Sequence, residues 1–181
     1  MNRIIAVCCS LLLLLGCNSA PERNELELWV GQKLMLDLRY FCADSTPTNE
    51  CRTAVTELPP ELAEVLRAGK IGGVILFADN LVDAPQIVKL IDTMQQVMRE
   101  AGLPPLFIAI DQEGGRVARL PAQVDVRYTG NMALGATYSA DAEHGRQLTH
   151  EVASRMAQVL HDLGFNLNFA PTVDVNVNPD N

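Results

Sequence analysis

The chain of 181 residues is long enough for one domain of ordinary size. Its content of 48% hydrophobic and 20% charged residues is typical of a globular protein and excludes an intrinsically disordered one. The formal net charge of -8 argues against binding to nucleic acid or to an anionic membrane face, and it leaves neutral or cationic partners, of which sugars are one class.

Residues 1–16 have the pattern of an export signal. One basic residue, Arg3, precedes an apolar run at residues 4–15 that is too short to span a bilayer comfortably. The run ends in Leu-Leu-Gly-Cys, which resembles the lipobox of bacterial lipoproteins, so we expect cleavage before Cys17 and attachment of lipid to it. A cleaved signal peptide with a chance cysteine is the alternative. Residues 17–24 would form a tether, and the asparagine after Cys17 favours a periplasmic protein anchored to the outer membrane.

The five cysteines divide between the signal and the mature chain. Cys8 and Cys9 would leave with the signal and Cys17 would carry lipid, so Cys42 and Cys51 remain. Export places this pair in an oxidising compartment, where we expect it to form a structural disulfide. A metal site would need further ligands, and no histidine lies between the two cysteines.

The rest of the chain predicts helices and strands in alternation. In chain order they are a helix at 25–34, a strand at 35–41, a helix at 61–68, a strand at 72–77, a helix at 84–101, a strand at 106–110, a helix at 141–163 and a strand at 165–170. The unbroken apolar runs of the later strands are typical of parallel strands that are buried on both faces. This order predicts an α/β fold.

A doubly wound sheet and a (β/α)8 barrel both give this order, and periodicity does not separate them. No glycine-rich phosphate loop follows the first strand, which counts against a nucleotide-binding sheet. A barrel needs eight strand–helix units and about 250 residues. Four strands are predicted here, with no helix between the last of them and Asn181. We therefore expect about four βα units, which is an incomplete domain.

Four charged residues gather directly after the strand at 106–110. They are Asp111, Glu113, Arg116 and Arg119, and a Gly-Gly pair lies among them. Strands in α/β domains end at the functional face, so we expect the Asp111 carboxylate at the rim of that face. The glycines allow a sharp turn or the close approach of a ligand. Arg116 and Arg119 are three residues apart, so only a helical turn would bring both to one side.

Three blocks of sequence carry a family resemblance. They are IGGVILFADN at residues 71–80, IAIDQEGGRVARL at 108–120 and GFNLNFAPTVDVNVNP at 164–179, with MALG at 132–135 between the last two. Together they resemble glycoside hydrolase family 3, in particular its bacterial β-N-acetylglucosaminidase branch. The resemblance implies a (β/α)8-type catalytic barrel, of which residues 25–181 would be the N-terminal portion. It also implies hydrolysis of terminal β-linked N-acetylglucosamine from peptidoglycan or chitin-type oligosaccharides, with retention, through a covalent glycosyl-enzyme intermediate.

The resemblance implies that Asp111 and Arg119 bind the sugar in the -1 subsite. A carboxylate accepts hydrogen bonds from sugar hydroxyls, and the fork of an arginine holds two oxygens at once. Asp174 faces the same rim, where contact with substrate and support of a loop both remain open. We interpret Glu113 as structural, paired with Arg116 or with backbone under the glycine turn. It is not expected to share catalysis with Asp111, because both carboxylates would lie on one side of the substrate.

The family's nucleophile and acid/base have no counterpart in residues 1–181. The resemblance places them in later segments, downstream of Asn181, so we expect no catalytic residue in this chain and no activity of the chain alone. No metal or other cofactor is expected, since His144, His150 and His161 lack the spacing of a zinc site. Trp29 is expected to pack in the core rather than to stack on a sugar.

Two other functions remain open at this point. One is a β-glucosidase-type enzyme of the same family, and the other is a lipid-anchored sugar-binding module without catalysis. Phosphorolysis in place of hydrolysis is also open. The expected partners are a carbohydrate that contains β-linked N-acetylglucosamine and, through the N-terminal lipid alone, a membrane.

Overall fold

The computed structural model describes residues 23–44, 46–47, 49–174 and 177. The expected export signal, Cys17 and most of the expected tether lie outside these residues. Asn181 lies outside them as well, so the expectation that the catalytic segments follow it stays a prediction. In the described part of the chain, no helix combines the length and the apolar character that crossing a membrane requires.

Four parallel strands form one sheet, in the order β1-β2-β3-β4. They are β1 (Met35–Asp37), β2 (Gly73–Leu76), β3 (Phe107–Ile110) and β4 (Leu167–Asn168). Each strand therefore lies beside its successor in the sequence, whereas a doubly wound sheet reverses its order part of the way across. The sequential order is that of a barrel wall and resolves the alternative that periodicity left open. The predicted α/β fold, with four of the strands of a barrel, is confirmed.

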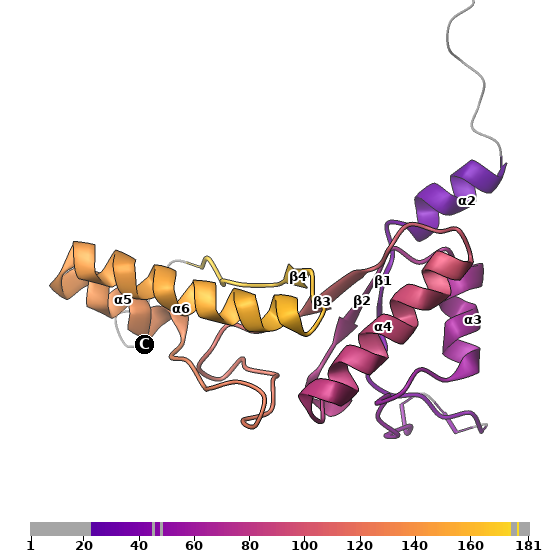
Figure 1. Ribbon diagram of the computed structural model, residues 1–181, viewed down its shortest axis with the longest axis horizontal. Coiled ribbons are helices and arrows are strands. Elements are labelled where there is room, and N and C mark those ends of the chain that lie inside the picture. Colours follow the sequence, from indigo (N-terminus) through magenta and orange to yellow (C-terminus); the bar gives the residue numbers. More distant parts are fainter. Residues whose placement is uncertain (1–22, 45, 48, 175–176, 178–181) are drawn as a thin grey trace, which may run out of the picture.

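The helices follow the predicted order with two additions, a short 3-10 turn and one α-helix. They are α2 (Arg23–Gly31), α3 (Pro60–Ala68), the 3-10 turn η1 (Ala78–Asn80), α4 (Ala84–Glu100), α5 (Asn131–Ala140) and α6 (Ala142–Asp162). Helix α5 was not expected, because Leu134 is its one buried side chain and it carries no apolar stripe. Figure 1 shows α3 and α4 beside the sheet, and α5 and α6 extending from it as a pair.

One face of the sheet is buried in the core, and the other, which we call the open face, is partly exposed, although Ala109 on it is buried. Val74, Leu76, Ile108 and Ile110 are buried in one core with the apolar residues of α3 and α4. Side chains alternate along a strand, so residues 73, 75, 107 and 109 face the other way. Phe107 on that face is 57% exposed. Right-handed crossovers between sequential strands put the helices on one side, and the open face is the one that a barrel would enclose.

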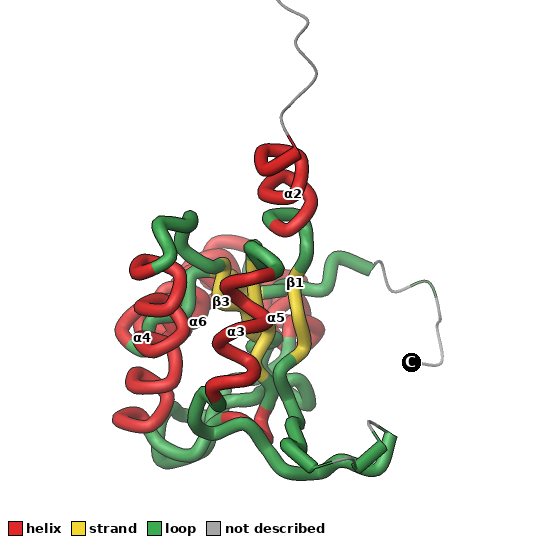
Figure 2. Tube along the Cα trace, turned by 90° about the vertical axis from the view of Figure 1, so that its right-hand side faces the viewer, coloured by secondary structure: helices red, strands yellow, loops and turns green. Residues whose placement is uncertain are grey.

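Helix α2 lies where the strands begin, and its middle stays uncovered (Figure 2). The helix meets the rest of the fold through its end, where a Cβ added to Gly31 would collide with the carbonyl oxygen of Gly69, and through Glu27, which pairs with Lys70 at 3.1 Å. Trp29 is 52% exposed, so the expectation that it packs in the core is wrong. The physical reason is that backbone at a glycine and one ion pair make these contacts, which leaves Trp29 without an apolar partner surface.

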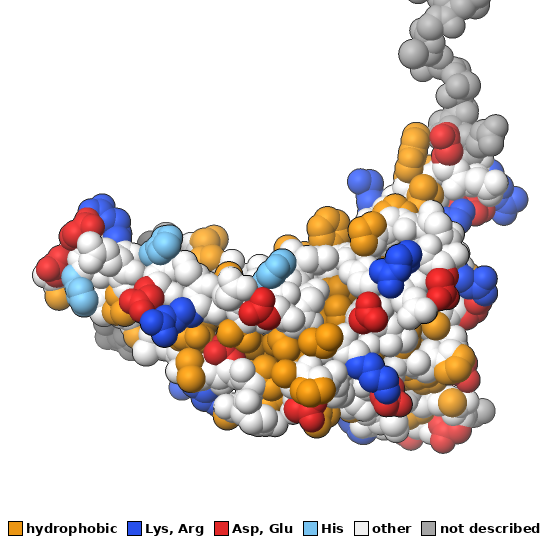
Figure 3. Space-filling view, in the orientation of Figure 1, with side chains coloured by type: hydrophobic (Ala, Val, Ile, Leu, Met, Phe, Trp, Pro, Cys, Tyr) orange, Lys and Arg blue, Asp and Glu red, His pale blue; other side chains and the backbone are white. Residues whose placement is uncertain are grey.

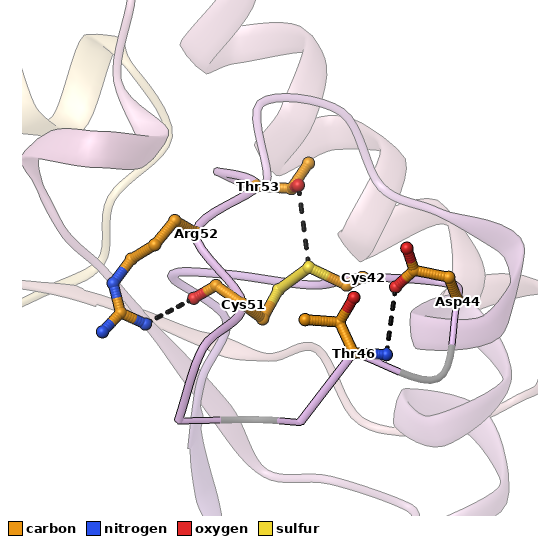
Figure 4. The surroundings of a disulfide bond; sticks show 6 residues. All are labelled: Cys42, Asp44, Thr46, Cys51, Arg52 and Thr53. Carbon is orange, nitrogen blue, oxygen red and sulfur yellow. Dashed lines mark hydrogen bonds between the residues drawn. A yellow bond between two sulfur atoms is a disulfide. The ribbon is translucent and has the colours of Figure 1, made fainter.

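A disulfide closes the loop that follows β1. Cys42 and Cys51 are bonded, with their Cα atoms 5.9 Å apart, and the Arg52 side chain donates to the Cys51 carbonyl oxygen at 2.6 Å (Figure 4). The predicted strand at 35–41 ends at residue 37 because the chain then turns to pair with residues 53–55. Tyr40 forms an antiparallel bridge with Ala54 there. The disulfide thus closes a short hairpin-like loop.

Asn80 joins the ends of the first two strands. Its Nδ2 donates to the carbonyl oxygens of Leu38, Arg39 and Val55, at 3.2, 3.2 and 3.0 Å. Its Oδ1 accepts from the backbone N–H of Phe77 at 2.9 Å. Because Asn80 is fully buried, the Phe77 N–H and the carbonyl oxygens of Leu38 and Val55 would lose this partner without it, while the Arg39 carbonyl oxygen would keep its hydrogen bond from the Val55 N–H. One amide therefore fixes the chain where it leaves both β1 and β2.

We expect Asn80→Ala to lower the free energy of unfolding by roughly 2–4 kcal/mol, since it leaves several buried backbone groups without a partner. Urea titration followed by circular dichroism measures this loss. Asn49→Ala, at an exposed position in the disulfide loop, is the matched control and should change the unfolding free energy by less than about 0.5 kcal/mol. Equal stability of the two variants would contradict the anchoring role.

Candidate functional site

The structure brings Asp111 and Arg119 together at the carboxyl end of β3. Asp111 directly follows Ile110, and alternation places it on the open face with Phe107 and Ala109. Nη2 of Arg119 lies 3.5 Å from Oδ2 of Asp111, and the two side chains are 28% and 25% exposed. A carboxylate and a guanidinium therefore lie side by side at the edge where α/β folds build their sites.

Gln112 explains how Arg119 reaches this position. Its side chain is 2% exposed, and Oε1 accepts from the backbone N–H groups of Arg119 at 2.7 Å and Leu120 at 3.3 Å. Asn168 on β4 holds Gln112 in turn: Oδ1 accepts from the Gln112 N–H and Nδ2 donates to its carbonyl oxygen, each at 2.9 Å. Two uncharged amides thus fix the loop that carries Arg119.

Neither amide was singled out from the sequence. A usable signal was present: alternation along β3 puts residue 112 on the buried side with Ile108 and Ile110. A polar side chain that is expected to be buried needs hydrogen-bond partners, and the nearest unpaired backbone groups are those of the loop that follows. The partner on β4 could not be found this way, because Asn168 lies 56 residues further along the chain.

The Gly-Gly pair forms a sharp turn rather than a helical one. Gly114 and Gly115 have φ angles of +85° and +57°, and a Cβ on Gly114 would collide with the carbonyl oxygen of Thr129. The Gly115 N–H donates to the carbonyl oxygen of Tyr128 at 2.9 Å. Burial, and then the nearby Asp125 carboxylate, raise the pKa of the Tyr128 phenol, so it stays a neutral donor in this loop. Only glycine fits where the two backbones approach so closely.

Glu113 has a structural role, as expected. Its backbone N–H donates to the Val117 carbonyl oxygen across the glycine turn at 2.8 Å. Its carboxylate forms no ion pair with Arg116, so that expected contact is wrong. Instead its Oε2 accepts from the Thr172 hydroxyl at 2.6 Å, the Thr172 N–H at 3.1 Å and Asn131 Nδ2 at 3.4 Å. Glu113 therefore ties the loop after β3 to the loop after β4. Arg116 is exposed and forms no ion pair with another described residue.

Asp174 and the three histidines form no part of this pair. Asp174 is exposed and makes no hydrogen bond or ion pair within the described residues, so its contact with substrate stays a prediction. His144, His150 and His161 belong to α6, and Figure 3 shows the histidine side chains on the outer surface of the molecule. Among the residues that the structure describes, no group of three potential ligand side chains could hold a metal ion.

The Asp111–Arg119 pair has bonding capacity to spare. Their 3.5 Å contact is long for a charged hydrogen bond, and Nε of Arg119 is buried without a hydrogen-bond partner among the described residues. The carboxylate can accept further hydrogen bonds while the guanidinium donates others. A ligand with adjacent hydroxyl groups, each able to donate and accept, fits such a pair.

A wide groove among the described residues lies elsewhere. Its volume is about 910 Å³, and it lies between α5, α6 and residues 171–172 without contact to Asp111 or Arg119. A smaller space of about 200 Å³ behind Gln112 and Glu113 is mainly apolar. A sugar-like ligand needs several polar groups that point toward it. The rim of β3 offers more such groups than these two spaces do.

Known proteins similar to this chain share one family. Residues 35–181 match the Glycosyl hydrolase family 3 N terminal domain. Beta-hexosaminidase A of Pseudoalteromonas piscicida is 50% identical over 154 residues, which cover 84% of this chain and 25% of that protein. A beta-hexosaminidase of Alkalilimnicola ehrlichii is 37% identical over 120 residues, or 66% of this chain and 33% of that protein. The chain thus spans a quarter to a third of these curated relatives.

Solved structures agree with this match. A glycoside hydrolase family 3 beta-N-acetylglucosaminidase from Paenibacillus sp. str. FPU-7 aligns with a TM-score of 0.68 and 36% identity, over 86% of this chain and 26% of that one. NagZ from Neisseria gonorrhoeae, in complex with N-trifluoroacetyl-D-glucosamine, aligns with a TM-score of 0.63 and 27% identity, over 76% of this chain and 36% of that one.

The anchoring of Arg119 by Gln112 can be tested by proteolysis. We expect Gln112→Met, which keeps the volume but removes the acceptor, to speed tryptic cleavage after Arg116 and Arg119 by roughly 30-fold, since two hydrogen bonds of about 1 kcal/mol each are lost from the closed loop. Peptide mass spectrometry locates and times the cuts. Cleavage after Arg67 on α3 serves as the internal reference for global unfolding. The control is Gln96→Met on the exposed face of α4, and equal cleavage after Arg116 in both variants would rule out the anchor.

Proposed function

The chain belongs to glycosyl hydrolase family 3, and we propose that the full-length protein containing it hydrolyses terminal β-linked N-acetylglucosamine from oligosaccharides. The observation that carries the proposal is the Asp111–Arg119 pair, which lies on the open face of the sheet at the end of β3 with spare donors and acceptors. The names of the relatives support the choice of sugar, because they are beta-hexosaminidases and beta-N-acetylglucosaminidases.

The pair would hold the terminal sugar in the -1 subsite. The Asp111 carboxylate accepts from hydroxyl groups of the ring, and the Arg119 guanidinium donates to neighbouring oxygens. A hydrogen bond to a charged group contributes about 1.5–3 kcal/mol. Gln112 and Asn168 hold the arginine loop before substrate arrives, so less ordering is needed on binding. The sugar is then fixed in place for the nucleophile and acid/base, which the resemblance places downstream of Asn181, to act with retention.

Peptidoglycan and chitin-type fragments are the proposed sources of the substrate. Both contain β-linked N-acetylglucosamine, and neutral sugars suit a chain with a formal net charge of -8. The proposed location is the periplasm, where such fragments meet a protein held at the outer membrane by lipid on Cys17. The disulfide between Cys42 and Cys51 supports an oxidising compartment.

The test uses the purified full-length protein and two aryl glycosides. We expect it to cleave aryl β-N-acetylglucosaminide in preference to aryl β-glucoside and to release the β-anomer first, as NMR of the fresh product shows. Cleavage of the glucoside alone would move the protein to the glucosidase branch. A rate that requires phosphate would indicate phosphorolysis. Binding of N-acetylglucosamine without turnover of either glycoside would overturn the enzymatic function and leave a sugar-binding module.

The same assay tests the binding pair. We expect Asp111→Asn to lower kcat/KM for aryl β-N-acetylglucosaminide by roughly 10- to 100-fold, because the neutral amide loses the charged acceptor for sugar hydroxyls. The matched control is Asp92→Asn on the exposed side of α4, which should keep the wild-type kcat/KM. If the Asp111→Asn variant keeps the wild-type kcat/KM, the pair does not bind the sugar in the -1 subsite.

Lipid attachment at Cys17 is tested in cells. We expect the protein to take up an alkyne-labelled fatty acid and to fractionate with the outer membrane, and we expect Cys17→Ser to abolish both. Cys8→Ser is the matched control, since Cys8 would leave with the signal and the label should persist. Equal labelling of the Cys17→Ser variant would exclude this anchor, and a soluble periplasmic wild-type protein would indicate a plain signal peptide.

A further inference from the structure

Helix α2 carries an exposed apolar face. Leu26, Trp29 and Val30 are 51%, 52% and 54% exposed, and Leu34, just after the helix, is 47% exposed. Figure 3 shows hydrophobic side chains standing out on α2. Leu26, Val30 and Leu34 also line a groove of about 390 Å³ beside the end of α3. Single exposed apolar side chains are common, but a contiguous patch of large ones indicates a surface that binds something.

The way α2 is held turns this face outward. The helix contacts the fold through Gly31 and Glu27, and the Gly31 carbonyl oxygen accepts from the backbone N–H of Gly72 at 2.9 Å. With about 100° between successive residues of a helix, Trp29 lies about 160° around the axis from both contact residues. Trp29 is therefore on the side of α2 that is turned away from the fold, and the other two apolar residues lie on one flank of it.

The expected lipid anchor comes just before this helix in the sequence. Arg23, where α2 begins, is six positions after Cys17. A fully extended chain covers at most about 3.6 Å per residue, so α2 begins within about 20 Å of the residue that would carry lipid. A protein held by lipid on Cys17 therefore brings α2 close to the membrane. The nine residues of α2 are too few to cross a bilayer, so the helix would lie on its surface.

The composition of the face suits the boundary between lipid headgroups and acyl chains. Tryptophan is enriched at this depth, because its ring is apolar and its indole N–H is a donor. The leucine and the valine beside it add apolar area that can be buried there. Basic residues do not dominate α2, where Arg23 stands against Glu25 and Glu27, and the chain has a formal net charge of -8. The contact is therefore expected to be apolar and to need no anionic lipid.

We propose that the face formed by Leu26, Trp29 and Val30 rests on the membrane surface, as a second attachment beside the lipid anchor. The inference rests on the proposed function, which includes lipid on Cys17. It also sets the orientation of the protein. Helix α2 lies where the strands begin (Figure 2), whereas Asp111 follows the carboxyl end of β3. Attachment through α2 therefore turns the proposed sugar site away from the membrane, toward soluble fragments.

The test uses the full-length lipidated protein in phosphatidylcholine vesicles that contain a phospholipid with a diazirine on its acyl chain. After illumination and digestion with trypsin, mass spectrometry compares the labelling of three peptides. They are 17–23, which would carry the lipid, 24–33 from α2, and 120–127 from the loop after β3. We expect label on the first two and none on the third, although Val126 in the third is 65% exposed.

Variants at the apolar face separate contact from mere proximity. Trp29→Ser should lower the labelling of peptide 24–33, relative to 17–23, by about tenfold, because loss of a large apolar side chain weakens insertion of the face. Trp29→Phe keeps an aromatic ring and should stay within about twofold of the wild type. The matched control is Val88→Ser, which removes an exposed apolar side chain from α4 and should leave the ratio unchanged. All three should cleave a soluble aryl β-N-acetylglucosaminide at the wild-type rate, which checks that they fold.

Each outcome decides between the claims. Label on 17–23 without label on 24–33 in the wild type overturns the inference, since another part of the full-length protein or a second copy then covers the face, and the proposed function stands. Equal labelling of 24–33 in the wild type and in Trp29→Ser also overturns it, as does labelling that requires anionic phospholipid. If Trp29→Ser loses activity, Val30→Ser decides in its place. Absence of lipid from peptide 17–23 overturns the proposed anchor, and the inference with it.

Discussion

The alternation of side chains along β3 is the constraint on which the rest of the site depends. Ile108 and Ile110 point into the core, so Asp111 must emerge on the open face and Gln112 must be buried. A shift of one residue would bury the Asp111 carboxylate and expose the Gln112 amide. This shift would destabilise the fold strongly, because a buried charge without a partner is costly. The register of β3 with β2 and β4 therefore decides that Asp111 faces outward, where a ligand could reach it, and that Gln112 faces inward, where it supports the loop.

Amide side chains hold the chain where the strands end. The strands are only two to four residues long, so the loops after them leave the sheet with few backbone partners. Asn80, Gln112 and Asn168 fill this gap, because an amide supplies donors and an acceptor without a charge to desolvate. Asp111 and Arg119 are thereby left free for the open face. Stability and the proposed sugar binding thus reside in different side chains of the same short segments.

Most of the fold, and the centre of the site, could be predicted from the sequence. Apolar runs indicated the strands, and the strand-end carboxylate with its glycines indicated the site; Arg119 came from the family resemblance. The unpredicted features depend on contacts between distant segments. Glu113 lies 59 residues from Thr172, and Gln112 lies 56 from Asn168. Helix α5 lacks an apolar stripe. Trp29 is exposed because α2 meets the rest of the fold through Gly31 and Glu27. Local pattern does not encode such contacts.

The open face also fits the proposed division of binding and catalysis along the sequence. Asp111 and Glu113 leave one strand end together, and the structure ties Glu113 to the loop after β4 rather than to a ligand. A retaining glycosidase needs two carboxylates that flank the bond, and one segment cannot supply both sides. In a barrel the opposite side comes from strands that face β3 across the interior. Four sequential strands, with Phe107 exposed among them, present one side of such an interior, so the proposed hydrolysis would need a carboxylate from strands other than these four.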